Sequence, residues 1–184
     1  MSALNPTLFL FLKFYMYKPT GIVFQPYVQH YIDLVPDGDL IAEFANQAPI
    51  IDQFLATITE EKSMHAYAPG KWTLKEMLQH IIDTERIFSY RAVCFARKET
   101  ASLPGFDENL YGSNMSANRR TWQDLVEEYK VVRLSLQLLF KSFTEEELLR
   151  TGMANNNVGM VGGIGFITLG HFYHHKKIIE ERYL

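Results

Sequence analysis

The residues best suited to chemistry in this sequence are histidines, three of which lie in the segment His171-Phe172-Tyr173-His174-His175. In an α-helix, residues four apart lie on one face, roughly 6 Å apart along the axis. His171 and His175 can therefore direct their imidazoles at one point, whereas His174 is predicted to be an exposed neighbour. This pair is half of a metal site, because catalytic zinc-type sites usually take three protein ligands and leave one position open.

His80 is the best candidate for a third ligand. It lies within the apolar run from Met77 to Ile82, so its imidazole should border or enter the core, where a buried polar group needs a partner. A divalent metal ion held by His80, His171 and His175 would be that partner. The alternative is a core histidine that forms an ordinary hydrogen bond.

A site of three neutral imidazoles leaves the full charge on the ion and open positions around it. Water held there has its pKa lowered towards about 7 and becomes a hydrolytic nucleophile. A thiol would be deprotonated in the same way and become the attacking group. The ligand set does not distinguish these chemistries, and it suits zinc, nickel, copper or iron.

Catalytic acids and bases are harder to assign from spacing. Glu76 and Asp83 each lie about one turn from His80 and are weak candidates. Glu76 can instead close a capping box with Thr73, and Asp83 can form an ion pair with a nearby arginine. Cys94 is predicted to be a core or interface cysteine, because it follows His80 by fourteen residues, about 21 Å along one helix.

The elements that position these residues are predicted to be helices. Apolar residues recur at spacings of three and four, and no convincing alternation of strand type occurs, so we expect an all-α four-helix bundle. Pro49 should kink or divide the first long helix. The stretch 155–165, with three asparagines and four glycines, is predicted to be a loop. The expected long helices cover residues 39–59, 73–98, 121–143 and 166–182.

Composition and charge place the chain among ordinary globular proteins. Hydrophobic residues make up 47% and charged residues 21%, and the net charge of −3 gives no footprint of nucleic-acid binding. We expect no membrane span, because the apolar run Leu8 to Tyr17 is too short. The single cysteine excludes an internal disulfide and fits a cytoplasmic location. Residues 1–20 are predicted to be an N-terminal extension, with Met16 as an alternative start, and residues 21–184 one domain.

Three stretches give the sequence a resemblance to a known family. It resembles the DinB superfamily (the DinB/YfiT-like four-helix bundles), and in particular its DinB_2-type branch, from about Pro26 to Leu184. The residues that carry the resemblance are Trp72-Thr73-Leu74-Lys75-Glu76 with His80-Ile81-Ile82-Asp83-Thr84-Glu85-Arg86, then Phe88-Ser89-Tyr90-Arg91 through Leu103-Pro104-Gly105-Phe106-Asp107, and Gly170-His171-Phe172-Tyr173-His174-His175 with Glu181-Arg182-Tyr183-Leu184.

The resemblance implies a metal site, in which one histidine of the second helix joins a His-x-x-x-His pair of the fourth. The matching positions are His80, His171 and His175, and the implied ion is nickel, zinc or iron. It also implies a homodimer, and a metal-dependent hydrolase or a thiol S-transferase that acts on a small molecule with a low-molecular-weight thiol such as bacillithiol or mycothiol. The alternative is a non-catalytic, stress-linked bundle with a structural metal, and a site open to a pocket would favour the enzyme.

Overall fold

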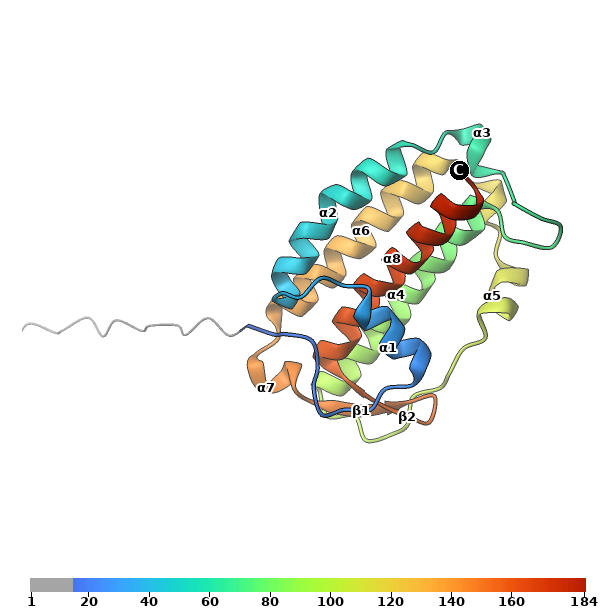
Figure 1. The fold of residues 1–184 in the computed structure, drawn as a ribbon. Coiled ribbons are helices and arrows are strands. Elements are labelled where there is room, and N and C mark those ends of the chain that lie inside the picture. Colours follow the sequence, from blue (N-terminus) through green and yellow to red (C-terminus); the bar gives the residue numbers. More distant parts are fainter. Residues whose placement is uncertain (1–14) are drawn as a thin grey trace, which may run out of the picture.

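Four long helices form the body of the protein. The computed structural model describes residues 15–184, in which α2 (Leu40–Ala56), α4 (Leu74–Ala96), α6 (Trp122–Ser142) and α8 (Val161–Arg182) form a bundle (Figure 1). Helices α4 and α2 each pack against both α6 and α8. The predicted all-α four-helix bundle is confirmed. None of the helices in residues 15–184 is both long and apolar enough to cross a membrane.

Helices α4 and α6 run in the same direction, although they follow one another in the bundle. Their N-termini meet, because the Lys75 amino group donates a hydrogen bond of 2.6 Å to the carbonyl oxygen of Arg120. Helices α2 and α8 begin at the other end, where Leu40 packs against Gly165. The connection from α4 to α6 returns along the bundle and carries two short helices, α5 (Glu108–Asn114) and η1 (Ala117–Arg119).

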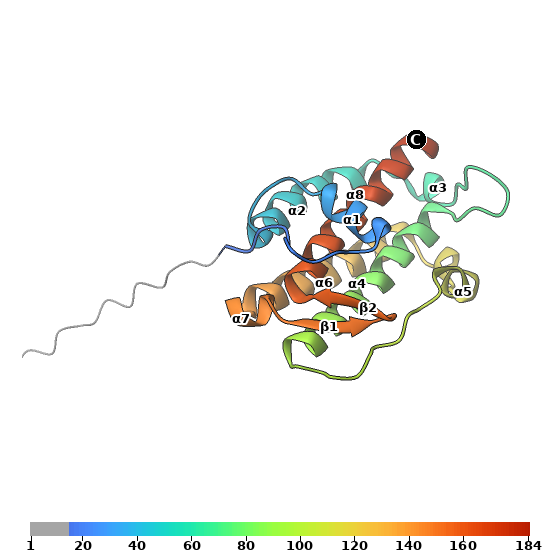
Figure 2. The same cartoon turned by 60° about the horizontal axis from the view of Figure 1, so that its bottom comes forward.

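Shorter elements cover the ends and one side of the bundle. Helix α1 (Pro26–Asp33) lies against α8 (Figure 2), and α3 (Glu60–Ser63) and α7 (Glu145–Leu148) are single turns. Strands β1 (Thr151–Ala154) and β2 (Asn157–Met160) form an antiparallel hairpin.

The hairpin corrects the prediction that no strands are present and that a loop begins at residue 155. Its two turn residues, Asn155 and Asn156, have φ angles of 49° and 59°. Asparagine tolerates this left-handed conformation, which two-residue hairpin turns require. Four-residue strands are too short to show a clear alternation in the sequence.

Helix α8 begins at Val161, five residues before its predicted start at Phe166. Each glycine in a helix costs about 1 kcal/mol relative to alanine, which is why Gly162, Gly163 and Gly165 favoured a loop. All three are buried, and a Cβ on Gly165 would lie 2.7 Å from a methyl carbon of Leu40. Close packing between helices therefore outweighs the weak helix propensity.

Side-chain caps begin three of the four long helices, α2, α4 and α6. The capping box of Thr73 and Glu76 is complete. Thr121 at the start of α6 accepts a hydrogen bond from the Asp124 amide, but the Asp124 carboxylate pairs with Arg120, so no complete capping box forms there. Helix α2 continues through Pro49, which therefore does not divide it.

The N-terminal segment packs on the bundle from Met16 onward. The Met16 side chain is buried, and its backbone N–H donates a hydrogen bond of 2.8 Å to Asp39. Residues 1–14, which include most of the apolar run Leu8 to Tyr17, lie outside the described residues. The predicted boundary between residues 20 and 21 stays a prediction.

The core consists of two apolar clusters with a polar layer between them. All four long helices contribute buried polar side chains at this level, among them Gln47, Glu85, Arg133 and His171. The Arg133 guanidinium pairs with Glu85 and donates a hydrogen bond of 2.6 Å to the Gln47 side chain, which in turn donates one of 2.9 Å to the Leu169 carbonyl. The buried charges are thus paired and hydrogen-bonded, as burial requires.

Candidate metal centre and its cavity

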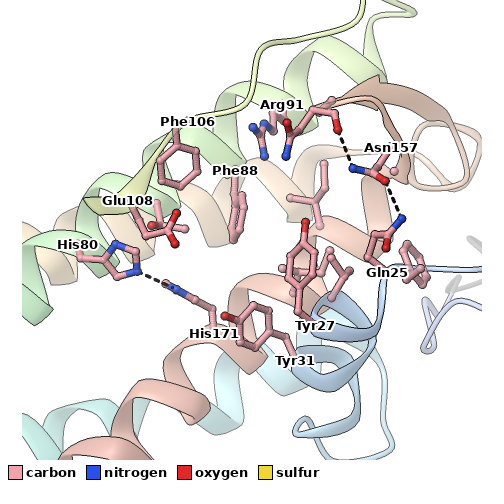
Figure 3. Close-up of a pocket in the computed structure, with 18 of the residues that line it drawn as sticks. Gln25, Tyr27, Tyr31, His80, Phe88, Arg91, Phe106, Glu108, Asn157 and His171 are labelled. Carbon is pink, nitrogen blue, oxygen red and sulfur yellow. Dashed lines mark hydrogen bonds between the residues drawn. The ribbon is translucent and has the colours of Figure 1, made fainter. Parts of the chain in front are cut away.

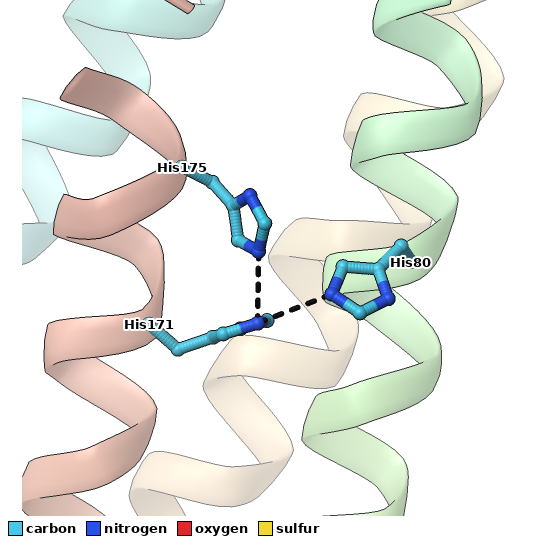
Figure 4. A group of neighbouring side chains, drawn as sticks. All are labelled: His80, His171 and His175. Atoms are coloured by element: carbon cyan, nitrogen blue, oxygen red, sulfur yellow. Dashed lines mark hydrogen bonds between the residues drawn. The ribbon is translucent and has the colours of Figure 1, made fainter. Parts of the chain in front are cut away.

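The three histidines singled out by their spacing come together in the structure. His80 projects from α4, and His171 and His175 project from adjacent turns of the antiparallel helix α8 (Figure 4). The Nε2 atom of His171 lies 3.2 Å from that of His80 and 2.9 Å from that of His175. All three side chains are buried, and together they form a group that could hold a metal ion.

Hydrogen bonding among the imidazoles alone leaves several ring nitrogens unsatisfied. The Nδ1 atoms of His171 and His175 are buried without a hydrogen-bond partner among the described residues. A neutral imidazole carries one donor and one acceptor, so no choice of tautomers pairs every nitrogen of the group. A cation at the point where the three Nε2 atoms converge would accept all three of their lone pairs, and the protons would then lie on the Nδ1 atoms. The donor set therefore fits a divalent metal.

Burial keeps these imidazoles in the form that binds metals. Loss of hydration, with a smaller effect of His174, lowers the pKa of His80 from 6.5 to about 4. Burial and the neighbouring histidines lower the pKa values of His171 and His175 well below 6.5, and Arg133 adds to the effect on His171. The imidazoles are consequently neutral at pH 7, with lone pairs available for coordination.

The histidines line one end of a cavity of about 520 Å³, a volume typical of small-molecule sites (Figure 3). Helices α4 and α8 form its floor, each with residues three or four apart that share one helix face. Helix α1, the hairpin and the segment around Phe106 form the opposite wall. The lining residues of the two helices are His80, Thr84, Phe88, Arg91 and Phe95 of α4, and Ile164, Ile167, His171 and His175 of α8.

Among the described residues, the charged side chains that line the cavity are Glu108 and Arg91. The histidines of the lining are neutral. Glu108 is the first residue of α5. This helix lies near His80, since its Gly112 contacts Trp72 and the Trp72 ring centre is 5.0 Å from that of His80. Burial, and to a smaller extent the negative charges of Glu108 and Tyr27, raise the pKa of the Tyr31 phenol. Arg91 lies at the other end, as Figure 3 shows.

Glu76 and Asp83, the weak catalytic candidates, do not line this cavity. Glu76 accepts hydrogen bonds from the Thr73 backbone (2.8 Å) and from Asn118 (3.1 Å). Asp83 accepts one from Gln79 (2.9 Å) and also pairs with Arg86. Both therefore have the structural contacts that were their alternative interpretation.

Sequence reasoning missed Glu108, which reaches the cavity through the long connection after α4. The only signal was its position directly after the stretch Leu103 to Asp107, which is part of the family resemblance.

His174 and Cys94 lie outside the group of ligands. His174 is half-buried rather than exposed, and its ring packs edge-on against those of His30 and Tyr31, at 5.5 and 5.2 Å. Cys94 is half-buried against the apolar core and does not line the cavity, in line with a packing role.

Comparison with known proteins shows the family of the chain and the similarity of its fold. The sequence profile of the DinB superfamily matches residues 43–179. The chain belongs to the DinB superfamily. Its fold is similar to that of YfiT from Bacillus subtilis, with a TM-score of 0.67 and 16% sequence identity over 90% of each chain. YfiT is described as "a probable metal-dependent hydrolase with an unusual four-helix bundle topology". No curated protein matches this DinB-superfamily sequence.

Proposed function

We propose that this protein is a metal-dependent hydrolase that holds one zinc, nickel or iron ion on His80, His171 and His175. The observation that carries the proposal is the opening of the three neutral imidazoles onto a cavity large enough for a small substrate. A structural metal site would be closed by protein side chains, so the cavity favours an enzyme over a non-catalytic bundle. The description of YfiT supports the same reaction class.

The cavity contains side chains suited to the steps of hydrolysis. A bound divalent ion would supply Lewis acidity towards water and a carbonyl group. Glu108 lines the cavity and, in this proposal, accepts a proton from the attacking water and returns it to the leaving group. Tyr31 stays protonated because its pKa is raised, and its ring lies 5.4 Å from that of His171, so it can donate a hydrogen bond to a substrate oxygen.

Metal content is the first test of the proposal. We expect about one ion per chain by elemental mass spectrometry, lost in His80→Ala and in His175→Ala. His174→Ala is the matched control, because it removes an adjacent imidazole of the same helix that does not join the group. Retention of the ion in His175→Ala and its loss in His174→Ala would show that the ligand assignment is wrong.

Activity is the second test. Glu108→Gln should retain the ion but lower kcat for ester or amide hydrolysis by about 10²- to 10⁴-fold, the usual contribution of a general base. Turnover without added thiol separates hydrolysis from thiol transfer, in which a low-molecular-weight thiol would be consumed. Turnover that requires a thiol would favour the transferase instead.

A further inference from the structure

Arg91 is a half-buried cation without a carboxylate partner in the part of the chain that the structure describes. The hydrogen bond of its side chain goes from Nη2 to the Pro104 carbonyl oxygen, at 3.0 Å. A guanidinium has five N–H donors, so most of them remain for a ligand. Five other arginines each pair with a carboxylate, namely Arg86, Arg97, Arg120, Arg133 and Arg150. Arg119 and Arg182 have no such pair among the described residues either, but they do not line the cavity.

Further hydrogen-bond donors lie at the Arg91 end of the cavity. Gln25 donates a hydrogen bond of 3.0 Å to the Asn157 side chain, which donates one of 2.6 Å to the Asn155 carbonyl (Figure 3). Each side-chain amide keeps a second N–H. The Tyr27 phenol also lines this end of the cavity. The group is therefore rich in donors and carries one positive charge.

The middle of the cavity is apolar and separates Arg91 from the histidines. Phe88 lies between the two polar ends in Figure 3, and the lining also includes the apolar side chains of Phe24, Val28, Ile164 and Ile167. Arg91 follows His80 by eleven residues of α4, which corresponds to about 16 Å of helical rise. Both side chains lean towards the helix N-terminus, and arginine is the longer, so the two polar ends are roughly 10–15 Å apart.

We infer that the substrate is a monocarboxylate whose carboxylate pairs with Arg91, whose apolar body fills the middle, and whose ester or amide bond lies at the histidines. One guanidinium can bind a carboxylate through two parallel hydrogen bonds and balances its single negative charge, whereas a phosphate dianion would keep one negative charge without a counter-charge among the lining residues. In the metal-free protein the Glu108 carboxylate at the histidine end repels a negative charge, which leaves Arg91 as the favoured partner of a carboxylate. The site of cleavage rests on the proposed function, whereas carboxylate binding does not.

The reaction needs no co-reactant besides water. The water oxygen forms a bond to the acyl carbon, and the C–O or C–N bond breaks. The leaving alcohol or amine takes the proton that Glu108 has removed from the water.

Binding of 4-phenylbutanoate, compared with the neutral 4-phenylbutan-1-ol, tests the carboxylate site. Isothermal titration of the full chain would measure both dissociation constants, as purified and after metal removal, so that binding to the ion is separated from binding to Arg91. Arg91→Met should weaken carboxylate binding by about 10- to 100-fold, the usual contribution of charged hydrogen bonds. Binding of the alcohol should change by less than about threefold, because the apolar walls remain.

Arg86→Met is the matched control, because Arg86 lies on the same helix but does not line the cavity. It should leave both dissociation constants unchanged. Equal carboxylate binding by wild type and Arg91→Met after metal removal would overturn the inference, as would no carboxylate binding to wild type at millimolar concentration. If either result is obtained with a protein whose metal site is intact, the substrate class is rejected and the hydrolase proposal stands. If Arg91→Met loses carboxylate binding but no metal site is found, the carboxylate site would stand and the hydrolase proposal would fail.

Discussion

Replacement of Gly170 by alanine is expected to destabilise the protein by about 1–3 kcal/mol, the usual cost of overpacking. Helix α1 crosses α8 at this residue, and an added Cβ would overlap the Tyr31 carbonyl group and lie 2.9 Å from Tyr31 Cα. Carbon atoms in contact normally lie about 3.5–4.0 Å apart, so the α1 backbone must move by roughly 1 Å or more. A main-chain segment cannot swing aside as a flexible side chain would.

Gly163→Ala is a control for this substitution within the same helix. A Cβ there would lie 3.3 Å from the tip of the Phe24 ring, which a small side-chain movement relieves. Alanine is also the better helix former by about 1 kcal/mol. Gly163→Ala should therefore be neutral or slightly stabilising, although the same methyl group is added.

Thermal unfolding followed by circular dichroism would measure both variants. A loss of 1–3 kcal/mol corresponds to a decrease in Tm of roughly 2–12 °C for a domain of this size. Because α1 contributes Tyr27, Val28 and Tyr31 to the cavity wall, Gly170→Ala should also weaken ligand binding there. A Tm for Gly170→Ala equal to or above that of Gly163→Ala would show that α1 does not pack on α8 as described.

Two further predictions concern buried ionisable groups. Because the pKa of His80 is lowered from 6.5 to about 4, the metal-free protein should lose about 3 kcal/mol from this residue as the pH falls from 6.5 to 4, since the unfolded state binds the proton more readily. Urea unfolding at several pH values would show this slope, which His80→Leu should reduce. Glu85→Leu should cost about 3–5 kcal/mol in urea unfolding at pH 7, because the Arg133 charge is left unpaired. The double variant Glu85→Leu, Arg133→Met should recover most of this loss, and no recovery would contradict the reasoning.

The helices and the histidine group could be predicted because their signals are local. Helix periodicity and threonine caps indicate α4 and α6 within a few residues, and an i, i+4 spacing brings His171 and His175 together whatever the rest of the fold. The apolar run around His80 made it the candidate for the third ligand, and the family resemblance implied the same residue. The homodimer and the cytoplasmic location that were also expected stay predictions.

Features that depend on distant contacts could not be predicted in this way. The start of α8 was missed because its glycines are poor helix formers. At Gly165 the missing side chain lets Leu40 and Phe140, which are distant in the sequence, pack against the helix. Glu108 reaches the histidine end only because the chain returns along the bundle after α4. Arg91 gave no sign that it would lack a carboxylate partner, since unpaired and paired arginines look alike in a sequence.

The polar layer through the bundle also determines the axial register of its helices. If one helix slid by a turn, about 5.4 Å, its member of the layer would enter an apolar cluster. For Glu85 or Arg133 this would bury an unpaired charge, at a cost of about 3–5 kcal/mol. His171 belongs to the same layer, so the contacts that align the helices also bring α8 to the height of His80. The geometry of the site is thus specified by core residues that take no part in its chemistry.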